Sequence, residues 1–181
     1  MILLDPDLEA AAARANRARG RVSAGKGSRA GRVPTARTLA RFLAEAQRAV
    51  RLRGRVSVLL TTDASIRRLN REFRGKDKAT DVLSFPADPI PGLKAAEQIA
   101  GDLALSVPTA RRQAVAQGHP LATELKVLLL HGLLHLAGYD HETDEGQMAR
   151  RERQLRARLG LPQGLIERVE RTAKHAAGAS R

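Results

Sequence analysis

The sequence predicts an α+β fold, in which a small mixed sheet of three to five strands packs with helices and one helix is buried in the core. Short β-rich runs bounded by Gly, Pro or polar residues recur along the chain. Longer segments between them repeat apolar residues at helical spacing. One of these, 122–137, is apolar around most of its circumference, which is typical of a helix buried on all sides.

The individual elements follow from local signals. Residues Leu39, Phe42 and Val50 lie on the apolar stripe of an amphipathic helix at 35–52. Thr62 or Asp63 can cap the helix that follows the strand at 55–61. In order, we expect an edge strand at 1–5, a helix at 35–52, a strand at 55–61 and a helix at 64–73. Strands at 82–85 and 101–107 and helices at 108–117, 122–137 and 143–159 follow.

The chain is expected to form a single domain over 1–162, followed by a C-terminal tail at 163–181. Within it, 12–34 is predicted to be a flexible basic insertion, because 14–37 carries eight Arg or Lys and no acidic residue. This stretch could contact phosphates or simply be solvated, and the sequence does not choose between the two.

Three of the five histidines lie within eleven residues of an apolar segment. His131 and His135 are four apart, so on a helix both rings project from one face, one turn apart. Gly138 can end the helix in a left-handed turn and bring His141 back as a third ligand. Three protein ligands and an open position for water are typical of a catalytic zinc ion. We therefore expect one Zn²⁺ per chain, although the ligand set also suits copper, nickel or iron.

The histidine spacing H-x3-H-x5-H, with Gly138 between the last two, is that of the metzincin proteases. The buried helix is in this sense zincin-like. Gly132, however, stands where those enzymes carry the glutamate that activates water. A metallopeptidase is therefore the less favoured alternative.

The charge of the chain favours a polyanionic partner. Its formal net charge is +13, from 32 Lys and Arg against 19 Asp and Glu. Arg74, Lys76 and Lys78 follow one another in a polar loop and could neutralise a phosphodiester. There are no cysteines, no run long enough to cross a membrane and no secretory signal, so we expect a cytoplasmic protein with no membrane partner.

Three blocks in the right order resemble the YbeY endoribonuclease family. They are HGLLHLAGYDH at 131–141, LNREFRGKDKATDVLSFP at 69–86 and GDL at 101–103. The resemblance implies a bacterial, metal-dependent endoribonuclease specific for single strands. It would act in rRNA maturation, at the 3′ end of small-subunit rRNA, and in ribosome quality control, with rRNA precursors and ribosomal subunits or their proteins as partners.

Residue by residue, the resemblance makes His131, His135 and His141 the zinc ligands and Arg74 the functionally important arginine. Lys76 and Lys78 are candidate RNA-binding residues. Asp102 and Asp140 are candidate acceptors for imidazole N–H groups. Phe73 replaces the usual Tyr, and Ala79 replaces the usual Pro. A non-catalytic ribosome-assembly factor with zinc remains the other alternative, and the oligomeric state is open.

Overall fold

The protein is described by a computed structural model that covers residues 1–8, 10, 32–140 and 144–162. In this part of the chain one four-stranded sheet has the order β1-β2-β4-β3. β1 (Ile2–Leu4), β2 (Arg55–Thr61) and β4 (Ile99–Ser106) are parallel, and β3 (Val82–Pro86) pairs antiparallel with β4 at the edge. The predicted α+β class with a small mixed sheet is confirmed.

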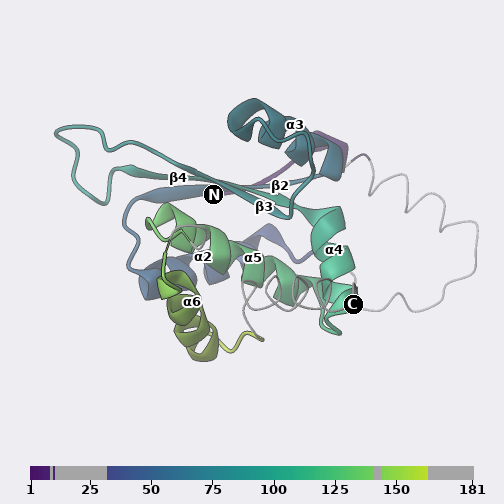
Figure 1. Cartoon of the computed structure of the whole chain (residues 1–181). Coiled ribbons are helices and arrows are strands. Elements are labelled where there is room, and N and C mark those ends of the chain that lie inside the picture. Colours follow the sequence, from purple (N-terminus) through teal and green to yellow (C-terminus); the bar gives the residue numbers. More distant parts are fainter. Residues whose placement is uncertain (9, 11–31, 141–143, 163–181) are drawn as a thin grey trace, which may run out of the picture.

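Helices lie on both faces of the sheet (Figure 1). α3 (Asp63–Arg74) covers one face, and its Ile66 packs with Leu83 and Ala104. On the other face lie α2 (Ala36–Val50), α4 (Val107–Ala116) and α5 (Leu121–Leu136), with α6 (Gln147–Arg158) packed against α5. The sheet therefore separates a small apolar cluster under α3 from the main core.

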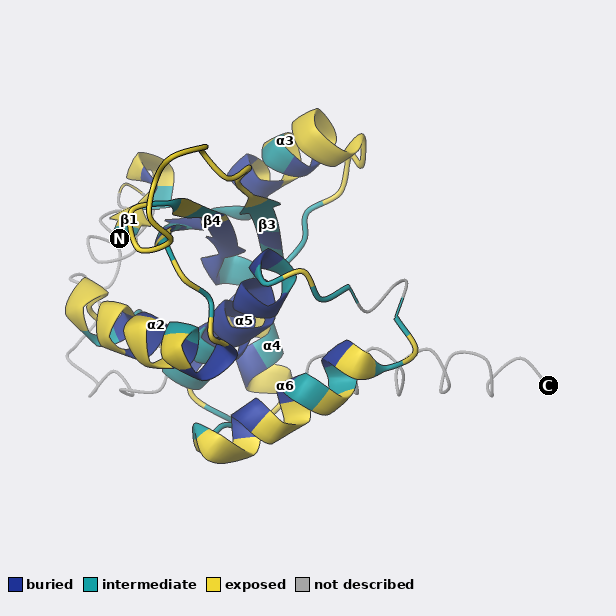
Figure 2. Cartoon of the chain, turned by 90° about the vertical axis from the view of Figure 1, so that its left-hand side faces the viewer, coloured by how far each residue is buried: buried dark blue, intermediate teal, exposed yellow. Residues whose placement is uncertain are grey.

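α5 is the centre of the main core (Figure 2). It is buried along most of its length because its sequence has apolar residues on every side. Val58, Leu60, Leu103 and Leu105 project from the sheet into the same cluster. The prediction of a buried helix at 122–137 is confirmed, one residue earlier at each end.

Two predicted elements have other bounds in the structure. The last helix is predicted from 143 but begins at Gln147, after the left-handed N-cap residue Gly146, and the Asp144 carboxylate accepts the N–H groups of Gly146 and Met148 at this end. The strand expected at 101–107 starts at Ile99 and ends at Ser106, whose hydroxyl caps α4 by accepting the N–H of Thr109.

Some predictions lie outside the described residues. These are most of the basic insertion at 12–34, the tail at 163–181 and the ligand His141. Among the helices that the structure describes, none combines the length and the apolar character needed to cross a membrane.

Candidate metal centre

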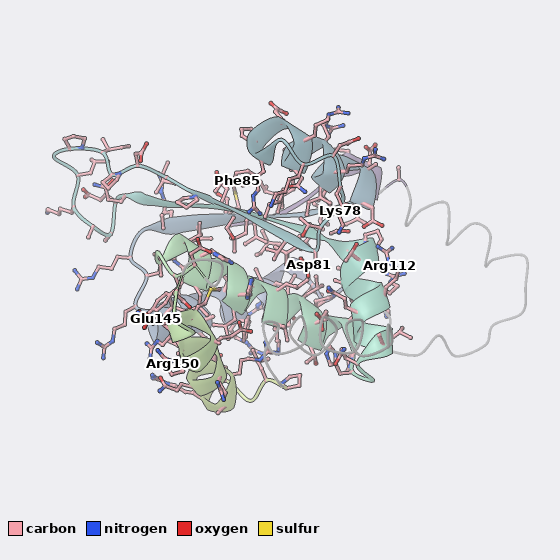
Figure 3. All side chains as sticks on the ribbon, in the orientation of Figure 1. Lys78, Asp81, Phe85, Arg112, Glu145 and Arg150 are labelled. Atoms are coloured by element: carbon pink, nitrogen blue, oxygen red, sulfur yellow. The ribbon has the colours of Figure 1, made fainter. Side chains whose placement is uncertain are left out.

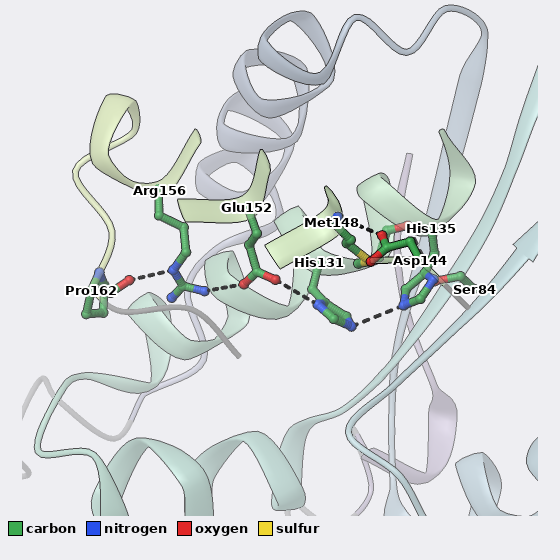
Figure 4. A network of polar contacts seen from close by, with 9 residues as sticks. Ser84, His131, His135, Asp144, Met148, Glu152, Arg156 and Pro162 are labelled. Atoms are coloured by element: carbon green, nitrogen blue, oxygen red, sulfur yellow. Dashed lines mark hydrogen bonds and ion pairs between the residues drawn. The ribbon is translucent and has the colours of Figure 1, made fainter. Parts of the chain in front are cut away.

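His131 and His135 face each other at the C-terminal end of α5 (Figure 4). Their Nε2 atoms are 3.2 Å apart, and the two rings are nearly perpendicular, at 76°. His131 is buried and His135 is partly exposed, so the pair opens to solvent on one side. The i, i+4 spacing on one helix is what brings the two nitrogens together.

This separation fits a shared zinc ion. Two nitrogens bound to one tetrahedral zinc at about 2.0–2.1 Å lie about 3.3 Å apart. The observed Nε2–Nε2 distance of 3.2 Å is close to that value. The spacing of the two nitrogens therefore suits a shared metal ion.

The chain turns sharply after His135. Gly138 has φ +88° and its N–H donates to the His135 carbonyl at 3.0 Å, while Tyr139 N–H donates to the Leu134 carbonyl at 3.1 Å. This pair of bonds is a Schellman motif, which ends a helix through a left-handed residue. The prediction that Gly138 ends the helix is confirmed. His141 follows directly but lies outside the described residues, and within those residues no three His, Cys, Asp or Glu side chains form a group that could hold a metal ion.

The far side of His131 contacts a buried charged network that the sequence did not reveal (Figure 4). Its Nδ1 lies 3.1 Å from Oε2 of Glu152 on α6. Oε1 of Glu152 accepts from Nη1 of Arg156 at 2.8 Å, and Nε of Arg156 donates to the Pro162 carbonyl. The one available signal was that Glu152 is the single acidic residue among five arginines in α6.

Gly132 packs directly against the sheet. A Cβ added there would lie 2.8 Å from Leu103 Cδ2 and 3.3 Å from Ser84 Oγ. The Ser84 hydroxyl approaches the Gly132 carbonyl at 3.4 Å. The position that carries a glutamate in the zincin proteases therefore faces the sheet and has no room for a side chain.

Asp102 is not near the histidines. Side chains alternate along β4, so Leu103 meets α5 while Asp102 projects from the opposite face of the sheet. There it lines a pocket of about 480 Å³ together with Leu59, Phe73 and Phe85. The structure thus does not bring Asp102 to His131 or His135. Asp140 is half-buried just beyond Gly138, and its carbonyl accepts the N–H of Asp144.

Arg74 ends α3, on the face of the sheet opposite to α5, and is exposed. Edge strand β3 connects the two sides. The Phe73 ring stacks edge-on against Phe85 at 5.2 Å, while the neighbouring residue Ser84 points to Gly132. Figure 3 shows Phe85 on the α3 side of the sheet. β3 thus lies between Phe73, which precedes Arg74, and Gly132, which follows His131.

The loop that carries Lys76 and Lys78 is held in place. The Asn70 amide donates to the Lys78 carbonyl at 2.7 Å. Arg67 binds both carboxylate oxygens of Asp77, at 2.8 and 2.6 Å, and these hydrogen bonds hold the pKa of Asp77 below its ordinary value. Both lysines are exposed, so this fixed loop presents its positive charge to solvent.

Comparison with known proteins adds a family. The model of the family described as Endoribonuclease YbeY matches residues 31–160. A protein of that description from Koribacter versatilis is 50% identical over 77% of this chain and 88% of its own length. One from Solibacter usitatus is 52% identical over 72% of this chain and 83% of its own length. A solution structure of a Thermotoga maritima protein is 26% identical and covers 70% of this chain and 85% of that one, with a TM-score of 0.47.

Proposed function

Because the chain belongs to the YbeY endoribonuclease family, we propose that it is a zinc-dependent endoribonuclease that cleaves single-stranded RNA. The proposal includes the maturation of the 3′ end of small-subunit rRNA and ribosome quality control in the cytoplasm. Its partners would be rRNA precursors and ribosomal subunits or their proteins. The observation that carries the metal dependence is the convergence of the His131 and His135 Nε2 atoms at 3.2 Å.

In this proposal His131, His135 and His141 hold one zinc ion and water takes the remaining position. Zinc supplies Lewis acidity, which polarises a phosphoryl oxygen and makes water easier to deprotonate at neutral pH. Gly132 leaves the site without the carboxylate base of a peptidase, which favours a phosphodiester over a peptide as the substrate. The chain would contribute positive charge instead.

Arg74 would bind the phosphate through its planar guanidinium, with Lys76 and Lys78 holding the flanking backbone. Supporting this are the exposure of all three side chains and the anchoring of their loop by Asn70 and the Arg67–Asp77 pair. The net charge of +13 would draw RNA towards the molecule.

The direct test is cleavage of rRNA precursors and of single- and double-stranded RNA by the purified protein, with and without a chelator. We expect cleavage of single strands that stops on chelation and returns with Zn²⁺. Cleavage that persists without metal would contradict the zinc dependence. A zinc-loaded protein that binds RNA but cuts none would support the non-catalytic assembly factor instead.

Arg74→Ala should keep the zinc content and lower kcat/KM for RNA by about 100-fold, the usual effect of removing one group that stabilises transition-state charge. Zinc content and cleavage are measured on the same sample. Arg41→Ala, an exposed arginine on α2, is the control and should leave both unchanged. Loss of zinc from the Arg74 variant would give Arg74 a structural role, and unchanged cleavage would remove it from the reaction.

A further inference from the structure

Two charged side chains of α6 are buried, unlike most of that helix. Glu152 is 1% exposed and Arg156 is 2% exposed. Burying charges is unfavourable unless each group is paired and hydrogen-bonded. Here the carboxylate lies between Arg156 and His131, and both of its oxygens have partners. The pair therefore lies directly behind a proposed metal ligand.

An ionised carboxylate has no proton, so it accepts hydrogen bonds and cannot donate them. Arg156 always carries its protons and therefore donates. The contact between Glu152 Oε2 and His131 Nδ1 at 3.1 Å therefore requires the ring proton on Nδ1. A neutral imidazole protonated at Nδ1 has its lone pair on Nε2. That is the nitrogen that faces His135 Nε2 at 3.2 Å.

We propose that Glu152 is a positioning residue for the metal centre: it holds His131 in the Nδ1–H tautomer and aims Nε2 at the metal, while Arg156 fixes the carboxylate. The inference rests on the proposed function, because it assigns a purpose to a site that binds zinc. Carboxylate partners of metal-bound histidines raise ligand basicity and fix ring orientation. α6 would thus serve the site although none of its residues binds the metal.

A purely structural role would be different in its consequences. If Glu152 and Arg156 only tie α6 to α5, their loss lowers the stability of the fold and leaves the affinity of folded protein for zinc unchanged. If Glu152 positions His131, zinc affinity falls even in variants that remain folded. In that case the variant also changes the tautomer of the His131 ring in the zinc-free protein.

Glu152→Gln separates these outcomes. Glutamine has a single acceptor oxygen, and we expect that oxygen to occupy the Oε1 position, where it accepts from Arg156. The amide NH₂ would then face His131 Nδ1, which can accept only if the ring proton moves to Nε2. We expect zinc affinity, measured by competition with a chromophoric chelator, to fall 10- to 100-fold. Glu45→Gln, the same change at an exposed position of α2, is the control and should bind zinc like the parent protein.

Nitrogen NMR of the ¹⁵N-histidine-labelled, zinc-free protein at pH 8 reports the tautomer directly. We expect Nδ1–H for His131 in the parent protein and a shift to Nε2–H in Glu152→Gln. Should the single variant fail to fold, Glu152→Leu with Arg156→Leu removes both buried charges, and weakened zinc binding is again expected.

The results also distinguish this inference from the proposed function. A parent protein that binds no zinc overturns the metal-dependent function, and the NMR spectrum still tests whether Glu152 sets the tautomer. Tight zinc binding by the parent that is unchanged in folded Glu152→Gln overturns the positioning role alone. His131 found as the Nε2–H tautomer in the zinc-free parent does the same.

Discussion

Gly132 lies inside α5, where glycine normally costs a helix about 1 kcal/mol relative to alanine. The contact with Leu103 reverses that preference, because a Cβ would come within 2.8 Å of Leu103 Cδ2. Gly132→Ala should therefore destabilise the protein, by about 1–3 kcal/mol as is usual for overpacking. The free energy of unfolding from denaturant titration measures the change.

A second variant checks that the contact is the cause. Leu103→Val shortens the side chain that the new methyl group would meet, so the double variant should lose less stability than the sum of the two single variants. A gain in stability from Gly132→Ala alone would show that helix propensity dominates and that the close packing of α5 on the sheet is not limiting.

The residues of the site differ in how far the sequence reveals them. The proximity of the His131 and His135 rings could be predicted, because i, i+4 geometry is local to one helix. Glu152 could not, because its contact with His131 depends on how α6 docks on α5. Asp102 was assigned to the site from its motif, but strand alternation turns it to the other face of the sheet.

At the scale of elements, Asp63 joins α3, β4 and α4. Its carboxylate accepts hydrogen bonds from the Ser106 hydroxyl, from Thr109 Oγ1 at 2.7 Å and from Arg112 Nη1 at 2.9 Å. Figure 3 shows Arg112 projecting from α4. Burial alone would raise the pKa of Asp63, but these hydrogen bonds and the charge of Arg112 outweigh it and lower the pKa below 3.8.

A depressed folded-state pKa gives the pH dependence a definite sign. The contribution of Asp63 is fully present above its unfolded pKa, near 3.8, and is lost as the pH falls through the lower folded value. The difference in unfolding free energy between the parent and Asp63→Asn should therefore be largest near pH 7 and shrink below pH about 4. Because the Asp63 carboxylate is partly exposed, we expect this difference in unfolding free energy to stay under about 1 kcal/mol.

Asp88→Asn, in the exposed loop between β3 and β4, is the control for this titration. Its unfolding free energy should follow that of the parent at every pH. An Asp63→Asn difference that grows in acid would mean that the hydrogen bonds from α4 do not stabilise the ionised carboxylate.

Helix and strand types could be predicted along the described chain, because apolar periodicity is a local property. The ends of helices were harder to predict, because they depend on hydrogen bonds of individual side chains. The start of α6 depends on which N–H groups the Asp144 carboxylate accepts, and the sequence offers several acidic residues near that point. α2 likewise ends at Val50, two residues before the predicted end at 52, with Arg51 in a left-handed conformation.

For the whole molecule, the strand order β1-β2-β4-β3 is what the sequence did not reveal, because strand pairing joins segments far apart in the chain. It places β3 at the edge, with α3 on one face and α5 on the other. The edge strand is therefore the link between the basic loop after α3 and the histidine pair. RNA that engages both would have to pass along or around β3.

This arrangement makes a prediction about salt. If Arg74, Lys76 and Lys78 each contact one phosphate, changing all three to Ala should make the slope of log affinity against log salt shallower by about 2, since single strands give about 0.7 per contact. Affinity for single-stranded RNA is measured by fluorescence anisotropy with chelator present.

Changing Arg37, Arg41 and Arg48 of α2 to Ala removes the same charge on the opposite face of the sheet. Its slope should stay near that of the parent. Equal slopes for the two triple variants would mean that net charge alone attracts RNA and that the loop after α3 is not its binding site.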